Sequence, residues 1–183
     1  WGVSTRLVGA LIMSHSDDRG LVVPPRLTPT EAVIIPIFKN KNKEEVLDYA
    51  RGLFDAMRGD FRVEFDDDDA NSPGWKFSEW EMLGVPVRVE IGPRDMESGN
   101  VVLVRRDTGE KEQVSRDAAS ARIRELLGEI QTSLYNRALQ LREENTFRQS
   151  DYGEFTALFN ENGGGFVETH WCGSTDCEAE IKA

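Results

Sequence analysis

The chain has 183 residues, of which 39% are hydrophobic and 30% charged, which is enough for one or two globular domains with ordinary cores. It contains no apolar run of about 18 residues, so a transmembrane helix is not expected, and its first residues lack the layout of a signal peptide. The formal net charge of −11 argues against general affinity for nucleic acids, and we expect binding neither to DNA nor to membranes.

The N-terminal residues predict a short apolar helix and then a connector. Residues 1–14 indicate the end of a strand followed by a helix, and residues 15–31 carry prolines that block further helix. The chain starts at Trp1 without an initiator methionine and stops at Ala183 within a helical pattern. We therefore expect a fragment that is cut at both ends.

A compact α/β domain is predicted in the middle of the chain. Residues 32–38 are a nearly continuous apolar run, which suits a strand covered on both faces, with Pro36 near the strand end or on a sheet edge. A helix with one apolar stripe is predicted at 43–58, where Asn42 and Glu45 have the spacing of a capping box. The further elements are strands at 61–65, 85–91, 101–105 and 111–114, a short helix at 75–83 and a long helix at 116–144. This order, β-α-β-α-β-β-β-α, indicates a mixed sheet flanked by helices.

The C-terminal residues predict a smaller α+β domain. A helix at 151–161 and a glycine turn at Gly163–Gly165 precede a strand at 166–171. The only cysteines, Cys172 and Cys177, follow this strand. Because two cysteines are fewer than a secreted disulfide scaffold would carry, we expect a cytoplasmic protein.

Ordered motifs extend over the whole chain. They are Trp1–Arg6, His15–Gly20, Pro24–Leu27, Pro73–Glu81, Gly84–Asp95, Val101–Lys111 and Trp171–Glu178. Together they resemble class II prolyl-tRNA synthetases, from motif 3 of the catalytic domain to the start of the C-terminal domain. The resemblance implies a catalytic-domain remnant and linker at 1–28, an anticodon-binding domain at 29–131, and a truncated zinc-binding-like domain at 132–183.

The same resemblance implies part of an enzyme that ligates proline to tRNA-Pro with ATP and Mg²⁺, in a homodimeric parent. Motifs 1 and 2 are absent from the chain, so we expect these residues to recognise the tRNA anticodon and not to catalyse the reaction alone. In the family the motif 3 arginine binds an ATP phosphate, which a planar guanidinium suits, and Arg6 matches it. By residue type and position alone, Arg6 is a surface arginine at a helix start.

Residues 76–124 are where an RNA-binding face is expected. This stretch holds nine basic and nine acidic residues, whereas the rest of the chain carries the whole net charge. A neutral face favours specific contacts to a few nucleotides over strong tracking of the phosphate backbone.

Four residues of this stretch have the chemistry to read guanine, of which a proline anticodon presents two. They are Phe77, Glu81, Arg88 and Lys111. A carboxylate accepts from N1 and N2 of guanine, an arginine or lysine donates to O6 and N7, and an aromatic ring stacks on a loop base. Phe77 and Glu81 share a helix face, and the resemblance places the family's guanine-reading residues at all four positions. The alternative is core packing for Phe77 and solvated charges for the others. Weaker candidates, for phosphate contacts, are Arg94, Arg105 and Arg106.

Cys172 and Cys177 match the first half of a four-cysteine structural zinc site that some family members carry. Four thiolates satisfy tetrahedral zinc, and this chain has two cysteines, so we expect zinc only in the full-length domain. The alternative is a pair of unligated thiols. Two further functions also remain open: a free-standing tRNA- or RNA-binding module, and a protein-interaction domain without catalysis.

Overall fold

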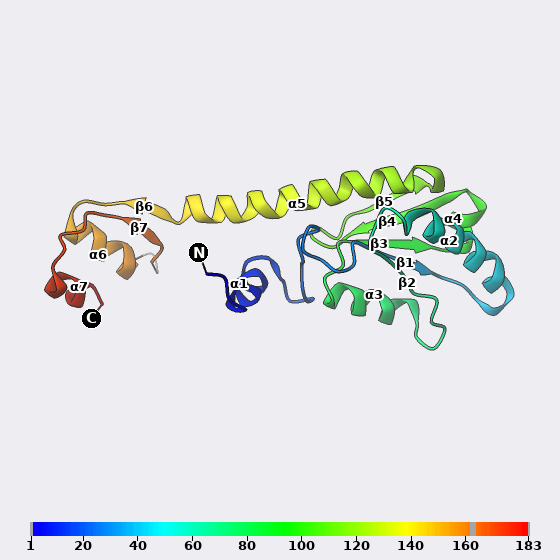
Figure 1. The fold of residues 1–183 in the computed structure, drawn as a ribbon, viewed down its shortest axis with the longest axis horizontal. Helices are drawn as coiled ribbons and strands as arrows, with labels where there is room; N and C mark the ends of the chain where they lie inside the picture. The colour runs from blue at the N-terminus through cyan, green and yellow to red at the C-terminus, as the bar shows by residue number, and fades with distance from the viewer. Residues whose placement is uncertain (1, 162–163, 183) are drawn as a thin grey trace. The chain divides into compact units, whose positions relative to one another are not determined.

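The computed structural model describes residues 2–161 and 164–182, which fall into two compact units. Unit 1 comprises Trp1–Asn136 and unit 2 comprises Arg137–Ala183. The long helix α5, Ala119–Glu144, begins in unit 1 and ends in unit 2 (Figure 1). In the part of the chain that is described, no helix is both long enough and apolar enough to cross a membrane.

Unit 1 is built on a five-stranded mixed sheet, as predicted. Its strands are β1 Ala32–Pro36, β2 Val63–Phe65, β3 Val87–Ile91, β4 Asn100–Arg105 and β5 Lys111–Ser115. The spatial order is β2-β1-β3-β4-β5, in which β1 pairs in parallel with β2 and β3, and β4 is antiparallel to both of its neighbours. Pro36 ends the central strand β1, where the missing amide hydrogen does little harm.

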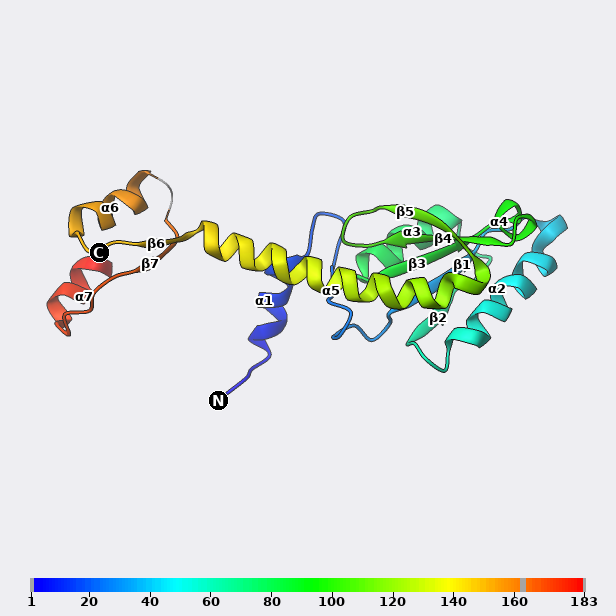
Figure 2. The same cartoon turned by 90° about the horizontal axis from the view of Figure 1, so that it is seen from above.

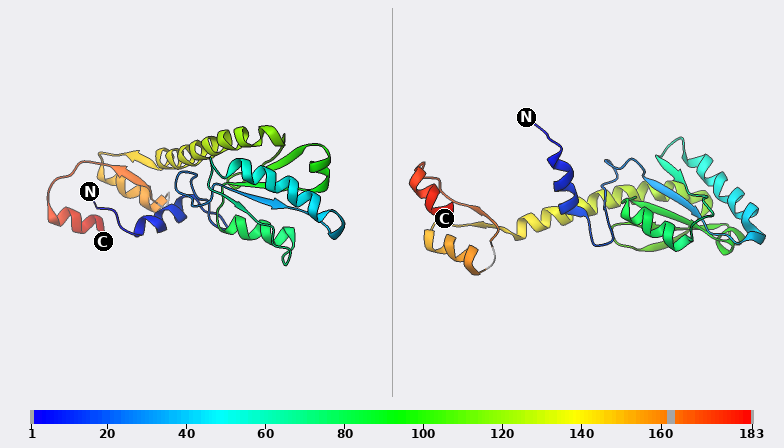
Figure 3. Two further views of the ribbon diagram at one scale, coloured as in Figure 1. Left: turned by 45° about the vertical axis from the view of Figure 1, so that its right-hand side comes forward. Right: turned by 90° about the horizontal axis from the view of Figure 1, so that it is seen from below.

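The strand order places the two crossover helices on opposite faces of the sheet. The first helix, α2 (Lys43–Met57), leads from β1 to β2 on one side, and the second, α3 (Pro73–Met82), leads from β2 past β1 to β3 on the other. Because both parallel crossovers are right-handed by rule, this reversal of direction moves α3 to the far face. Figure 1 and the left view of Figure 3 show α2 and α5 on one side and α3 on the other.

The main core lies between the sheet and the helices α2 and α5. Its fully buried side chains include Ile34, Leu103 and Ile123, and the buried stripe of α5 runs from Ala119 to Leu134. A second, smaller cluster lies under α3, where Val33, Ile35 and Val85 are buried against half-buried aromatic rings. The α3 face is therefore the less apolar side of the sheet.

Several predicted element boundaries are wrong, for local reasons. Asn42 does not cap α2; its side chain accepts a hydrogen bond from the Lys39 amide at 2.8 Å and closes the preceding 3-10 turn, η1 (Asn40–Asn42). Helix α3 begins at Pro73, since Ser72 accepts from the Trp75 amide and proline suits the first helical turn. The short helix α4, Pro93–Glu97, was not predicted. The 3-10 turn η2, Arg116–Ala118, precedes α5.

The N-terminal helix α1, Arg6–His15, has no buried residue, and residues 2–4 form no strand, contrary to the prediction. The connector after it packs against the end of α3. The Leu21 amide donates to the Met82 carbonyl at 3.0 Å, and a Cβ on Gly20 would lie 2.4 Å from the Met82 Cα. This close approach of two backbones requires glycine at position 20.

Unit 2 is a small α+β unit. Its two strands, β6 (Thr146–Arg148) and β7 (Phe166–Glu168), pair in parallel, and the helices are α6 (Tyr152–Glu161) and α7 (Thr175–Lys182) (Figure 2). The helix predicted at 151–161 is confirmed, the strand predicted at 166–171 is shorter, and β6 was not predicted. Of the predicted glycine turn, Gly163 lies outside the described residues.

Candidate nucleic-acid interface

Strand register brings two of the four predicted guanine-reading residues, Arg88 and Lys111, onto one face of the sheet. Arg88 on β3 lies opposite Val104 on β4, and Val104 lies opposite Lys111 on β5, so the three side chains form a row on one face. On the other side of β3, Arg88 pairs with Val33 of the small cluster under α3. The row therefore lies on the α3 face, next to the helix that carries Phe77 and Glu81.

Four charged side chains form a continuous cluster there, which we call the charged tetrad: Glu81, Arg88, Glu90 and Lys111. Arg88 donates from Nη1 to Glu81 Oε1 and from Nε to Glu90 Oε1, both at 3.0 Å. Lys111 Nζ lies 3.1 Å from both carboxylate oxygens of Glu90. The tetrad contains two acids and two bases, so its formal charge is zero.

The fourth predicted residue, Phe77, lies beside the tetrad. The Arg88 guanidinium carbon is 4.4 Å from the centre of the Phe77 ring, and Lys111 Nζ is 6.0 Å from it. Cations at this range are attracted to the face of an aromatic ring. The structure thus brings Phe77, Glu81, Arg88 and Lys111 together, although they come from one helix and two strands.

Glu90 is the member of the tetrad that the sequence analysis missed. It lies two residues after Arg88 on β3, and side chains at that spacing on a strand point to the same face. This spacing could have predicted that Glu90 lies beside Arg88, but the sequence alone is equally consistent with an ordinary solvated acid.

The four side chains of the tetrad differ in how far they are buried. The side chains of Arg88 and Glu90 are 9% and 11% exposed, whereas those of Glu81 and Lys111 are 26% and 55% exposed. A ligand on this face therefore meets Glu81 and Lys111 first, with Arg88 and Glu90 behind them.

The helix α3 is held in place by polar contacts at both ends. Asp66 accepts from the buried Lys76 ammonium in the first half of the helix at 2.9 Å and from the Trp80 indole in the second half at 2.7 Å. Near its end, Arg106 Nε donates to the Glu81 carbonyl at 2.9 Å, and its other nitrogens donate to Asp17 at 2.8 and 2.6 Å. The hydrogen bonds from Arg106 hold the pKa of Asp17 well below its usual value.

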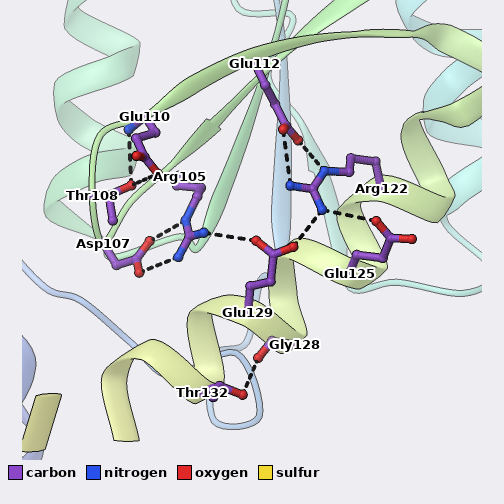
Figure 4. Close-up of polar contacts among 10 residues, drawn as sticks. All are labelled: Arg105, Asp107, Thr108, Glu110, Glu112, Arg122, Glu125, Gly128, Glu129 and Thr132. Atoms are coloured by element: carbon purple, nitrogen blue, oxygen red, sulfur yellow. Dashed lines mark hydrogen bonds and ion pairs between the residues drawn. The ribbon is translucent and has the colours of Figure 1, made fainter. Parts of the chain in front are cut away.

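The hairpin that carries Lys111 is tied to α5 by a second ion network (Figure 4). Arg105 on β4 pairs with Asp107 at 2.8 Å and with Glu129 on α5 at 3.1 Å. Arg122 on α5 lies 2.7 Å from both Glu112 on β5 and Glu129. Hydrogen bonds to these carboxylates raise the pKa of Arg122, first through Glu112, and Arg122 in turn lowers the pKa of Glu129.

Two of the three arginines predicted to contact phosphate are bound to carboxylates of the protein, and the network with α5 also orients the hairpin. Arg105 and Arg106 are both held by carboxylates, while Arg94 on α4 is exposed. Glu112 and Lys111 are neighbours on β5, so their side chains point to opposite faces. Fixing Glu112 on α5 therefore presents Lys111 to the α3 face.

The other predicted site residues lie far from the tetrad in the sequence, and their side chains are exposed. Arg6 is exposed at the start of α1. Cys172 and Cys177 are exposed free cysteines, and the Ser174 amide, 3.4 Å from the Cys172 sulfur, helps to lower the pKa of that thiol. Among the described residues, no group of three or more His, Cys, Asp or Glu side chains is placed to hold a metal ion, so these two thiols do not by themselves fit a closed zinc site.

Comparison with known proteins agrees with this geometry. The family model described as "Anticodon binding domain" matches residues 31–126, just over half of the chain. The chain therefore belongs to the anticodon-binding domain family. It is 51%, 53% and 50% identical to the proline–tRNA ligases of Rubrobacter xylanophilus, Oceanobacillus iheyensis and Prosthecochloris aestuarii, respectively, in alignments that cover 100% of this chain. The chain spans 37–38% of the length of these relatives.

Proposed function

We propose that this chain recognises the anticodon of tRNA-Pro as part of a proline–tRNA ligase. The observation that carries the proposal is the convergence of Phe77, Glu81, Arg88 and Lys111 on one face of the family's own domain. The names of the relatives, all proline–tRNA ligases, supply the amino acid and the tRNA.

The tetrad and Phe77 match the chemistry of an unpaired guanine. Glu81 is half-buried and can accept from the N1 and N2 hydrogens on the Watson–Crick edge, where adenine offers no such pair of donors. Lys111, the most exposed member, can donate to O6 or N7, and the uncovered part of Arg88 can do the same. The Phe77 ring can stack on a neighbouring base of the loop.

The remaining functional assignments follow from the same proposal. In the whole enzyme, proline is activated with ATP and Mg²⁺ and then transferred to tRNA-Pro, in the cytoplasm and within a homodimer. Arg6 contacts an ATP phosphate, and Cys172 and Cys177 supply half of a zinc site where the remaining ligands are present. Residues 1–28 belong to the catalytic part, 29–131 bind the anticodon, and 132–183 belong to the C-terminal domain.

Binding titrations with RNA stem-loops test this proposal. One stem-loop carries the two guanines of a proline anticodon, and a second carries adenines at those positions. We expect the wild-type chain to prefer the guanine loop, and Glu81→Gln or Lys111→Met to lose about 1–3 kcal/mol of that preference. Arg94→Met, which removes an exposed charge from α4, is the matched control and should weaken both loops alike.

The same titration separates the alternatives. Equal binding of both loops by the wild type would refute anticodon reading and favour a general RNA-binding module, and binding of neither would favour a protein-interaction domain. Catalysis is tested separately by proline-dependent pyrophosphate exchange. The 183 residues alone should show none above background, since motifs 1 and 2 are absent from them.

A further inference from the structure

We infer that Glu90 is a positioning residue for the recognition of guanine. It holds the side chains of Arg88 and Lys111 in one geometry and cancels one of their two positive charges. The site therefore binds guanine selectively and binds the phosphate backbone less strongly. This inference rests on the proposed function, because it names what makes that function selective. Glu90 itself is largely covered and acts through its two cationic neighbours.

The geometry gives Glu90 a position between the two cations. Its Oε1 accepts from Arg88 Nε at 3.0 Å and from Lys111 Nζ at 3.1 Å, so a single oxygen joins β3 to β5 across β4. The residue opposite Glu90 on β4 is Val102, a side chain without a polar group. Glu90 is thus the group that links the two cations over the apolar strand between them.

Stability alone does not account for a carboxylate in this place. Glu90 is buried on a central strand, where removing a charge from water carries a penalty that an ion pair only partly repays. An apolar residue at position 90 would extend the row of valines already present on this face at Val102 and Val104.

Glu90 also restrains Lys111 before the RNA binds. A lysine side chain as exposed as Lys111 otherwise samples many rotamers, and restraining it in advance reduces the entropy lost on binding.

Charge balance is the second part of the inference. With Glu90 ionised the tetrad is neutral, and without its charge the site carries one net positive charge beside an exposed lysine. Extra positive charge strengthens attraction to any phosphate, whatever the sequence of the RNA. Glu90 therefore reduces general affinity and increases the difference between a right and a wrong base.

The test is Glu90→Gln, which keeps the size of the side chain and removes its charge. The chain is titrated with the guanine and adenine stem-loops described above over a range of salt concentrations. We expect the guanine-to-adenine affinity ratio to fall about tenfold, the lower end of what loss of a supporting residue costs in metal sites. The adenine loop should bind the variant as tightly as the wild type or more tightly. The slope of log affinity against log salt concentration (the salt slope) should become steeper by up to about 0.7, the value for one added phosphate contact on a single strand.

Two further variants keep the result interpretable. Glu97→Gln on α4 makes the same change in net charge at an exposed position outside the tetrad, and it should leave the ratio at the wild-type value. Glu90→Asp keeps the charge but is one methylene shorter, so it cannot reach both cations as Glu90 does. It should lower the ratio without steepening the salt slope, and it tests the inference if Glu90→Gln does not fold.

The outcomes separate the inference from the proposed function. A wild-type preference for guanine that survives in both Glu90 variants would overturn the role of Glu90 and leave anticodon reading intact. Equal losses for both loops, in step with a lower melting temperature, would reduce Glu90 to a structural residue. A wild type with no preference would overturn both.

Discussion

The two faces of the five-stranded sheet are built for different tasks. The face under α2 and α5 is apolar, and side chains such as Ile34, Leu103 and Ile123 are fully buried there. The face toward α3 has a small apolar cluster at one side and four interacting charges at the other. Among the described residues, the ten-residue helix α3 lies on this second face, and Glu81 and Lys111 beside it keep 26% and 55% of their side chains exposed.

The difference shows how one sheet carries an apolar core on one face and a charged cluster on the other. Alternate residues of β3 and β4 point to opposite faces, so Val89 enters the main core while Arg88 and Glu90, on either side of it, enter the tetrad. The main core fixes the strands, and the strands fix the charges. Changes on the two faces should therefore separate stability from base selectivity.

The largest expected effect is on the apolar face. Leu103→Ala removes a fully buried side chain from β4 and should destabilise the protein by about 2–5 kcal/mol, by lost burial and a new cavity. Denaturant unfolding measures the change. Val102→Ala, on the same strand but half-buried on the other face, should lower the free energy of unfolding clearly less. A similar loss for both variants would contradict the proposal that the apolar face provides most of the stability.

On the α3 face, Phe77→Ala should weaken RNA binding by about 1–3 kcal/mol, the value of one base stacked on an aromatic ring. Because stacking tolerates any base, the guanine and adenine loops should lose similar amounts. Titration of both loops is the measurement, with thermal melting to confirm that the variant folds. A loss confined to the guanine loop would assign Phe77 to base selection.

The support of α3 should show a smaller effect. Asp17→Asn leaves the 2%-exposed Arg106 guanidinium without its carboxylate and should cost about 1–2 kcal/mol of unfolding free energy, reduced because Asp17 itself is 38% exposed. Asp18→Asn, a neighbouring exposed acid, is the matched control. Equal stability of the two variants would mean that the Asp17–Arg106 pair contributes nothing measurable.

The same pair predicts a pH dependence. The pKa of Asp17 is lowered from its ordinary value of 3.8, so its stabilisation is fully present above that pH and is lost as the pH falls toward the folded-state pKa. The difference in unfolding free energy between wild type and Asp17→Asn should be constant from pH 7 to about 5. Below pH 3.8 it should shrink. A difference that grows on acidification would contradict this assignment.

The smallest expected effect is in the network between the hairpin and α5. Glu129→Gln removes the charge shared by Arg105 and Arg122, yet both arginines keep another carboxylate, so we expect a loss of only about 0–1 kcal/mol. Thermal melting at low and high salt checks it, since added salt should reduce the difference. A loss above that of Asp17→Asn would rank this network above the support of α3.

Periodicity and composition by themselves determined most of the elements and the neutral stretch, residues 76–124, in which the candidate residues lie. The apolar run before Pro36, the stripe of α2 and the spacing of Phe77 and Glu81 are local patterns, and local patterns reveal strands, helices and shared helix faces. The resemblance to synthetases then pointed to Arg88 and Lys111. Local reasoning failed at Asn42, whose side chain closes the preceding turn instead of capping α2, and at α4, a five-residue helix too short to show a periodic apolar stripe.

Only the tertiary structure decided which of these residues meet. The pairing of Val104 with both Arg88 and Lys111, and the passage of α3 to the face opposite α2, depend on strand register and crossover handedness. Neither the strand register nor the crossover handedness can be predicted from one segment alone, because both arise when residues distant in sequence pack into the same core. Glu90 illustrates the consequence: in the sequence it is one acid among 33, and it becomes the link between two cations only when β4 places β5 within its reach.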